Sequence, residues 1–190
     1  MRIGLLGGSF DPPHNGHLLA AGDAYDTLAL DRVVFIPAAI QPFKAGGATA
    51  TAQQRLGMVE CLIDGDGRFE VSTVEIERGG LSYTVDTLTT LSSRWSPAEL
   101  FWLVGADVPH SFDQWRDPAR IVELATVVVM ERTAKASDCP AVPGGVTAIA
   151  TRRIDISSTE IRRRVREGKS IRGFVPDAVA RFIASERLYR

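Results

Sequence analysis

The chain has 190 residues, of which 45% are hydrophobic and 24% charged, with a formal net charge of −1 at pH 7. This composition is typical of a globular protein, and without a basic tract we do not expect non-specific nucleic-acid binding. No apolar run reaches the roughly 20 residues of a membrane helix, and the chain enters a strand without the pattern of a signal peptide. Cys61 and Cys139 lack metal-ligand spacing. We therefore expect a cytoplasmic protein with a single domain over residues 1–190 and no membrane partner.

Strand-like and helix-like patterns alternate along the first half of the chain. The predicted elements are a strand at 3–6, a helix at 17–30, a strand at 33–36, a helix after Thr51 and a strand at 69–76. The all-apolar run at 33–36 is typical of a strand buried on both faces. The loop at 38–50, rich in glycine, alanine and threonine, is either a lid over a ligand at the carboxyl edge of the sheet or a plain surface loop.

The same alternation continues in the second half. We predict a helix at 84–95, a strand at 100–104, a helix starting at Asp117, strands at 126–130 and 146–149, and helices after Ile156 and near Pro176. Residues 134–145 form an irregular connection in this prediction. The order favours an α/β fold with a doubly wound, mostly parallel, Rossmann-like sheet and a small C-terminal helical part.

The segment between the first strand and the first helix has the features of a phosphate site. Gly7 and Gly8 let a ligand approach the backbone closely, and the start of the following helix favours an anion. His14 and His17 are three residues apart, so both imidazoles project from one face if a helix begins near His14. The alternative is that the histidines are turn and cap residues on a solvated loop.

Two further segments suggest helix starts that accept anions. In Ile156-Ser157-Ser158-Thr159-Glu160-Ile161-Arg162, Ser157 and Glu160 fit a capping box. In Arg78-Gly79-Gly80-Leu81-Ser82-Tyr83-Thr84-Val85-Asp86-Thr87-Leu88, the amides near Thr84 suit a small carboxylate. Each segment taken alone also fits a simple cap. Trp115 lies in a polar stretch, where it either stacks on a flat heterocycle or covers the edge of the sheet.

Together these motifs resemble the bacterial nicotinate mononucleotide adenylyltransferases. Gly7 to His17 looks like the family's G-G-[ST]-F-D-P-x-H-x-G-H signature, residues 156–162 are similar to I-S-[ST]-T-x-I-R, and residues 78–88 to R-G-G-x-S-Y-T-x-D-T-L. The resemblance implies an α/β nucleotidyltransferase that moves AMP from ATP to nicotinate mononucleotide in NAD biosynthesis. The products would be nicotinate adenine dinucleotide and pyrophosphate.

The resemblance also implies which residues form the site. The implied ATP site comprises Gly7, Gly8, Ser9, Phe10, His14, His17, Gly105, Asp107, Ile156, Ser157, Ser158, Thr159 and Arg162. The implied nicotinate mononucleotide site comprises Ser9, Lys44, Tyr83, Thr84, Trp115 and Arg132. The implied catalytic residues are His14, His17, Lys44 and Arg162, which offset phosphate charge. We leave Arg163, Arg164 and Arg166 as a solvated helix face.

The chain departs from the family pattern at two places. Phe43 replaces the histidine of the common P-P-H-K lid sequence, and Thr133-Ala134 replaces a proline-glycine after Arg132. We expect Mg²⁺ to act with ATP, held mostly by substrate phosphates, because the sequence lacks a dedicated set of ligands. Oligomeric state, including a homo-oligomer, stays open, as does acid versus amide preference.

Three alternative functions follow from the same residues. The nearest is another acceptor in the superfamily, such as phosphopantetheine, against which the segment at 82–84 and Trp115 argue. A synthetase fragment fits poorly because no tRNA-binding region follows. A non-catalytic nucleotide-binding regulator is disfavoured because His14, His17 and Arg162 are all present.

Overall fold

Six parallel strands form one sheet in the order β3-β2-β1-β4-β5-β6. The computed structural model describes residues 1–42, 47–106, 112–131 and 146–190. The strands are β1 (Arg2–Gly8), β2 (Arg32–Pro37), β3 (Phe69–Val71), β4 (Glu99–Gly105), β5 (Thr126–Glu131) and β6 (Val146–Ala150). From β1 the chain adds β2 and β3 on one side of the sheet and then β4, β5 and β6 on the other. This switch between β1 and β4 leaves a crevice at the carboxyl ends of the two strands. The predicted Rossmann-like fold class is confirmed.

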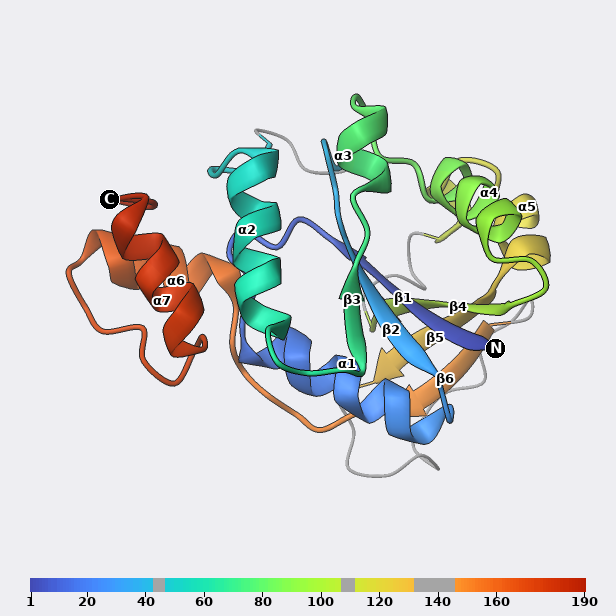
Figure 1. The fold of residues 1–190 in the computed structure, drawn as a ribbon, viewed down its shortest axis with the longest axis horizontal. Helices are drawn as coiled ribbons and strands as arrows, with labels where there is room; N and C mark the ends of the chain where they lie inside the picture. Colours follow the sequence, from blue (N-terminus) through green and yellow to red (C-terminus); the bar gives the residue numbers. More distant parts are fainter. Residues whose placement is uncertain (43–46, 107–111, 132–145) are drawn as a thin grey trace.

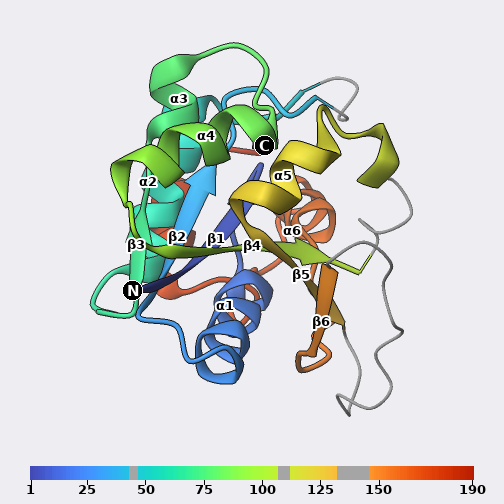
Figure 2. The same ribbon diagram turned by 90° about the vertical axis from the view of Figure 1, so that its right-hand side faces the viewer.

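Helices cover both faces of this sheet (Figure 2). They are α1 (Asn15–Thr27), α2 (Ala52–Ile63), α3 (Val74–Arg78), α4 (Thr84–Arg94), α5 (Pro118–Leu124), α6 (Ser158–Arg166) and α7 (Asp177–Ser185). Figure 1 shows α6 and α7 beside α2, away from α4 and α5. None of the helices in the described ranges is long and apolar enough to cross a membrane.

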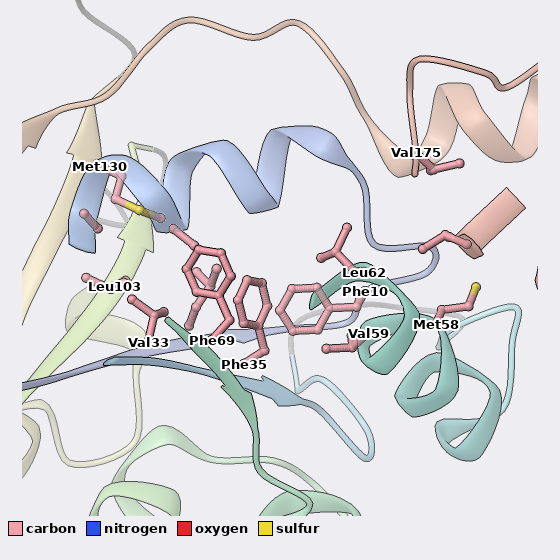
Figure 3. Close-up of a cluster of buried hydrophobic side chains, with 14 of the residues drawn as sticks. Phe10, Val33, Phe35, Met58, Val59, Leu62, Phe69, Leu103, Met130 and Val175 are labelled. Atoms are coloured by element: carbon pink, nitrogen blue, oxygen red, sulfur yellow. The ribbon is translucent and has the colours of Figure 1, made fainter. Parts of the chain in front are cut away.

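The two faces of the sheet bury two separate apolar layers because successive side chains of a strand point to opposite sides. Leu6 and Leu103 face α1 and α2, whereas Leu5 and Trp102 face α4. In Figure 3, Phe35 lies between Phe10 and Phe69 in the first layer, and its ring centroid is 5.8 Å from that of Phe10 and 5.6 Å from that of Phe69. The central strands are therefore covered on both sides, as their all-apolar sequences predict.

The predicted strand at 69–76 is wrong in its second half. β3 ends at Val71, and α3 starts at Val74. β3 is an edge strand that pairs with β2 only from Phe69 to Val71. The amide of Ser72 still donates to the carbonyl of Phe35, at 2.9 Å, but the next residues turn and bury the side chain of Val74 in the layer that faces α4. The conformation of residues 72–76 therefore follows from the burial of Val74, and not from the alternation of apolar and polar residues.

Candidate active site

A cavity of about 830 Å³ lies at the carboxyl ends of β1 and β4. Its lining includes every predicted site residue that the structure describes, namely Gly7, Gly8, Ser9, Phe10, His14, His17, Tyr83, Thr84, Gly105, Trp115, Ile156, Ser157, Ser158, Thr159 and Arg162. Lys44, Asp107 and Arg132 lie outside the described residues, as does Phe43. Segments more than 140 positions apart in the sequence thus meet around one space.

Glycines at the end of β1 let the chain pass close to its neighbours. A Cβ on Gly7 would come within 2.9 Å of the Trp102 ring, and one on Gly8 within 3.2 Å of the Phe10 ring. Phe10 has a φ of 49° and is buried, with its ring 5.1 Å from that of His17. The loop that follows β1 is consequently anchored by an aromatic side chain inside the core.

The two histidines stand together at the start of α1. His14 is the N-cap residue in extended conformation, and its backbone amide donates to Nδ1 of His17 at 3.2 Å. The ring centroids are 3.8 Å apart. Because Nδ1 of His17 accepts a hydrogen bond, the neutral ring carries its proton on Nε2 and can donate from there. The expectation that both rings share one face of the helix start is confirmed.

The N-terminus of α6 faces this same loop. The Ser157 hydroxyl caps the helix by accepting from the amide of Glu160 at 3.2 Å, and the Ser158 hydroxyl donates to the carbonyl of Pro12 at 2.8 Å. Arg162 donates to the carbonyl of Asp11 at 2.6 Å. Two helix N-termini with their partial positive charge therefore border one cavity. Of the arginines left as a solvated face, Arg164 departs from that interpretation, since its guanidinium packs over the Phe174 ring at 4.6 Å.

Through its carboxylate, Asp11 connects the first loop to two other segments, a role that sequence reasoning did not find. Its buried carboxylate accepts from the amides of Thr49 and Ala50 at 2.7 and 3.0 Å and from the hydroxyl of Tyr189 at 2.8 Å. Burial, and then the neighbouring negative charge of Asp11, raise the pKa of Tyr189 well above its ordinary value, so the phenol stays a donor.

Arg55 is a second unpredicted anchor. It is only 2% exposed, and its guanidinium donates to the carbonyls of Ser9, Ala38 and Ala50 at 2.7, 2.6 and 3.3 Å. Burial lowers its pKa, and the nearby Asp11 counteracts that effect. One side chain thereby links the phosphate-type loop to the segment after β2. Its position three residues before Met58, on the buried face of α2, was the sequence signal that could have found it.

The start of α4 and the segment before α5 form the other end of the cavity. α4 begins at Thr84, as predicted, with Tyr83 as N-cap and without a side-chain cap. Trp115 is half-buried and packs against Phe112, with centroids 5.5 Å apart. The guanidinium of Arg116 lies 4.9 Å from the centroid of the Tyr83 ring. Aromatic surface and the amides of a helix start together suit a flat anionic ring.

In the described part of the chain, the carboxylates near the cavity do not form a metal cage. No three or more His, Cys, Asp or Glu side chains within these ranges cluster so as to hold a metal ion. Asp11 already accepts hydrogen bonds through both oxygens.

Sequence comparison identifies the family of this chain. The cytidylyltransferase-like family model matches residues 5–164. A protein of Gemmatimonas aurantiaca is 51% identical over 100% of this chain and 93% of its own length, and one of Thermus thermophilus is 44% identical over 100% of both chains. Both bear the name probable nicotinate-nucleotide adenylyltransferase. The chain belongs to the nicotinate-nucleotide adenylyltransferase family.

Solved structures agree on the fold of this adenylyltransferase. The nicotinic acid mononucleotide adenylyltransferase of Plasmodium falciparum has been solved with NaAD and with APC. Each of these structures is 17% identical in sequence and matches 99% of this chain with a TM-score of 0.77, covering 97% and 96% of the solved chains. At this identity the likeness supports the fold.

Proposed function

We propose that this adenylyltransferase transfers AMP from ATP to the 5′-phosphate of nicotinate mononucleotide. The observation that carries the proposal is the meeting of two helix N-termini, His14, His17 and Arg162 around one cavity with an aromatic far end. The names of relatives that match the whole chain support the same acceptor. The lining of the cavity includes the starts of α1 and α6 as well as the start of α4, which is what an approach of two nucleotides from opposite ends requires.

The proposed reaction is a single displacement at the α-phosphorus. An oxygen of the acceptor phosphate forms a bond to that phosphorus, and the bond to the oxygen bridging the α and β phosphates breaks. Pyrophosphate leaves with the electron pair. Because the second pKa of the acceptor phosphate is about 6, this nucleophile is largely dianionic at neutral pH and needs no general base. The site must mainly hold two polyanions in line and stabilise the leaving charge.

His14, His17 and Arg162 are the residues that we assign to that charge. Both imidazoles line the cavity at the start of α1, and Nε2 of neutral His17 is a hydrogen-bond donor. Loss of one such donor costs on the order of 3 kcal/mol, so H17A should lose about a hundredfold in turnover. Ser157, Ser158 and Thr159 would receive the triphosphate at the N-terminus of α6, beside Gly7 and Gly8.

The remaining assignments concern the acceptor and the metal. Amides at the start of α4 near Thr84 would bind the ring carboxylate, and Trp115 would stack on the ring. We assign Lys44 to the leaving phosphates, Asp107 to ribose and Arg132 to the acceptor, as the family resemblance implies. Mg²⁺ would enter with ATP and supply charge neutralisation between phosphates.

The test measures pyrophosphate release from ATP and Mg²⁺ with three acceptors offered separately. We expect release with nicotinate mononucleotide to exceed release with nicotinamide mononucleotide, and phosphopantetheine to be inert. Pyrophosphate release with phosphopantetheine alone would show that the enzyme uses another class of acceptor. Release with none, combined with ATP binding by calorimetry, would identify a nucleotide-binding regulator.

A further inference from the structure

A buried acid lies in the wall of the cavity, outside the motifs discussed so far. Glu75 belongs to the short helix α3 and is only 4% exposed, although it lines the cavity. By contrast, Glu77, two residues further along the same helix, is exposed to solvent. A carboxyl group in such a position requires hydrogen-bond partners, because a buried unsatisfied acid is costly.

Hydroxyl groups of two residues interact with it. The Thr87 hydroxyl, from α4, donates to Oε1 of Glu75 at 2.7 Å. The Ser82 hydroxyl lies near the same carboxyl and acts, like Thr87, to lower its pKa through hydrogen bonding. Ser82 is held from its other side by the amide of Ala39, which donates to its oxygen at 3.0 Å. Its own amide donates to the carbonyl of Ile40 at 2.9 Å. Glu75 therefore joins α4 to the segment that precedes it.

The charged groups around Glu75 act at a distance or through a neutral side chain. Arg78, also of α3, donates to the Thr87 oxygen at 3.0 Å, and Arg55 of α2 adds a further positive charge. Burial nevertheless raises the pKa of Glu75 above its ordinary value of 4.5. The Thr87 hydroxyl is thus in direct contact with the carboxyl, and no lysine or arginine within the described residues forms an ion pair with it.

Tyr83 and Thr84 lie in the sequence between Ser82 and Thr87, the two residues whose hydroxyls interact with Glu75. Ser82 comes directly before them, and Thr87 occupies the next turn of α4, where it is fully buried. Because Ser82 and Thr87 both interact with the Glu75 carboxyl, this carboxyl fixes the direction in which the first amides of α4 point. A shift of this segment would change the acceptor end of the cavity and leave the α6 end untouched.

We propose that Glu75 is a positioning residue for the acceptor nucleotide, acting through Ser82 and Thr87. This inference rests on the proposed function, since it assumes that the start of α4 receives the nicotinate ring. Glutamine at this position keeps the size of the side chain but places an amide donor beside the hydroxyls of Ser82 and Thr87. The loss of about one net hydrogen bond corresponds to about a tenfold change in affinity.

The experiment compares KM values of the two substrates in four variants. E75Q should raise the KM for nicotinate mononucleotide about tenfold and change the KM for ATP less than about twofold. T87V, which removes the hydroxyl, should reproduce this pattern, whereas T87S, which keeps it, should resemble the wild type. E77Q is the matched control on α3. Calorimetric binding of nicotinate mononucleotide without ATP provides a readout independent of turnover.

The outcomes separate the two hypotheses. If E75Q and T87V raise both KM values equally, or neither, Glu75 is an ordinary structural residue and the inference is wrong. If T87S is as impaired as T87V, packing and not the hydroxyl matters, and the inference is again wrong. If the wild type itself does not use nicotinate mononucleotide, the proposed function fails first.

Discussion

Gly16, between the two histidines, offers a test in which activity should fall while stability stays nearly constant. A Cβ on Gly16 would lie 2.9 Å from Nδ1 and 3.0 Å from Cε1 of His14. Ordinary contact begins at 3.4 Å, so G16A must displace that buried ring by about 0.5 Å. Gly16 lies in the first turn of α1, where alanine is the better helix former by about 0.5–1 kcal/mol.

A displacement of about 1 Å at a reacting centre can cost about a hundredfold in rate, so half that shift should reduce kcat about tenfold. The free energy of unfolding should stay within about 1 kcal/mol of the wild type, because the helix gain offsets the local crowding. Steady-state pyrophosphate release and urea denaturation measure the two quantities.

G22A is the matched control for this prediction. Gly22 lies in the same helix, but a Cβ there would meet only the far end of Arg68, at 3.8 Å. We expect G22A to gain stability and keep full activity. A G16A enzyme with wild-type kcat would show that the position of His14 does not limit the reaction and would refute the role that we assign to it.

Three further predictions concern the buried anchors. R55K should lower the free energy of unfolding by about 3 kcal/mol, since an ammonium group cannot span the carbonyls of three segments; a loss below about 1 kcal/mol in urea denaturation would contradict this. Y189F removes one donor to Asp11 and should cost about 1 kcal/mol in the same assay, and an unchanged midpoint would argue that the bond is unimportant. Glu75, whose pKa is raised in the folded state, contributes stability that is present below its unfolded pKa of 4.5 and lost as pH rises through the folded value. The stability of the wild type relative to E75Q should therefore fall as pH increases from 4.5, and a constant difference would show that Glu75 does not titrate in this way.

Local signals in the sequence predicted much of the fold and of the site. The all-apolar run at 33–36 became a central strand, and the helix predicted after Thr51 is α2, which has Thr51 as its N-cap residue. The histidine pair was predictable because a helix start fixes the relation of residues three apart. Such features depend on residues that are close in sequence, so the amino-acid sequence alone is enough to predict them.

Contacts between distant segments were not predictable in this way. Arg55, Glu75 and Tyr189 each owe their role to partners in other elements, and Tyr189 meets Asp11 across 178 positions. The alternation at 69–76 predicts a strand, but burial of Val74 in the layer that faces α4 accompanies a helix over residues 74–78. An isolated charged residue in a helix pattern carries no sign of which carbonyls or hydroxyls the fold will bring to it.

The central claim is transfer of AMP from ATP to the acceptor phosphate with an acceptor oxygen as the nucleophile, and isotope labelling tests it most directly. Nicotinate mononucleotide carrying ¹⁸O in its 5′-phosphate is incubated with ATP, Mg²⁺ and the enzyme, and both products are analysed by mass spectrometry. Our account predicts that nicotinate adenine dinucleotide forms and retains all of the label, with none in pyrophosphate. Label in pyrophosphate, or the absence of the dinucleotide, would contradict it.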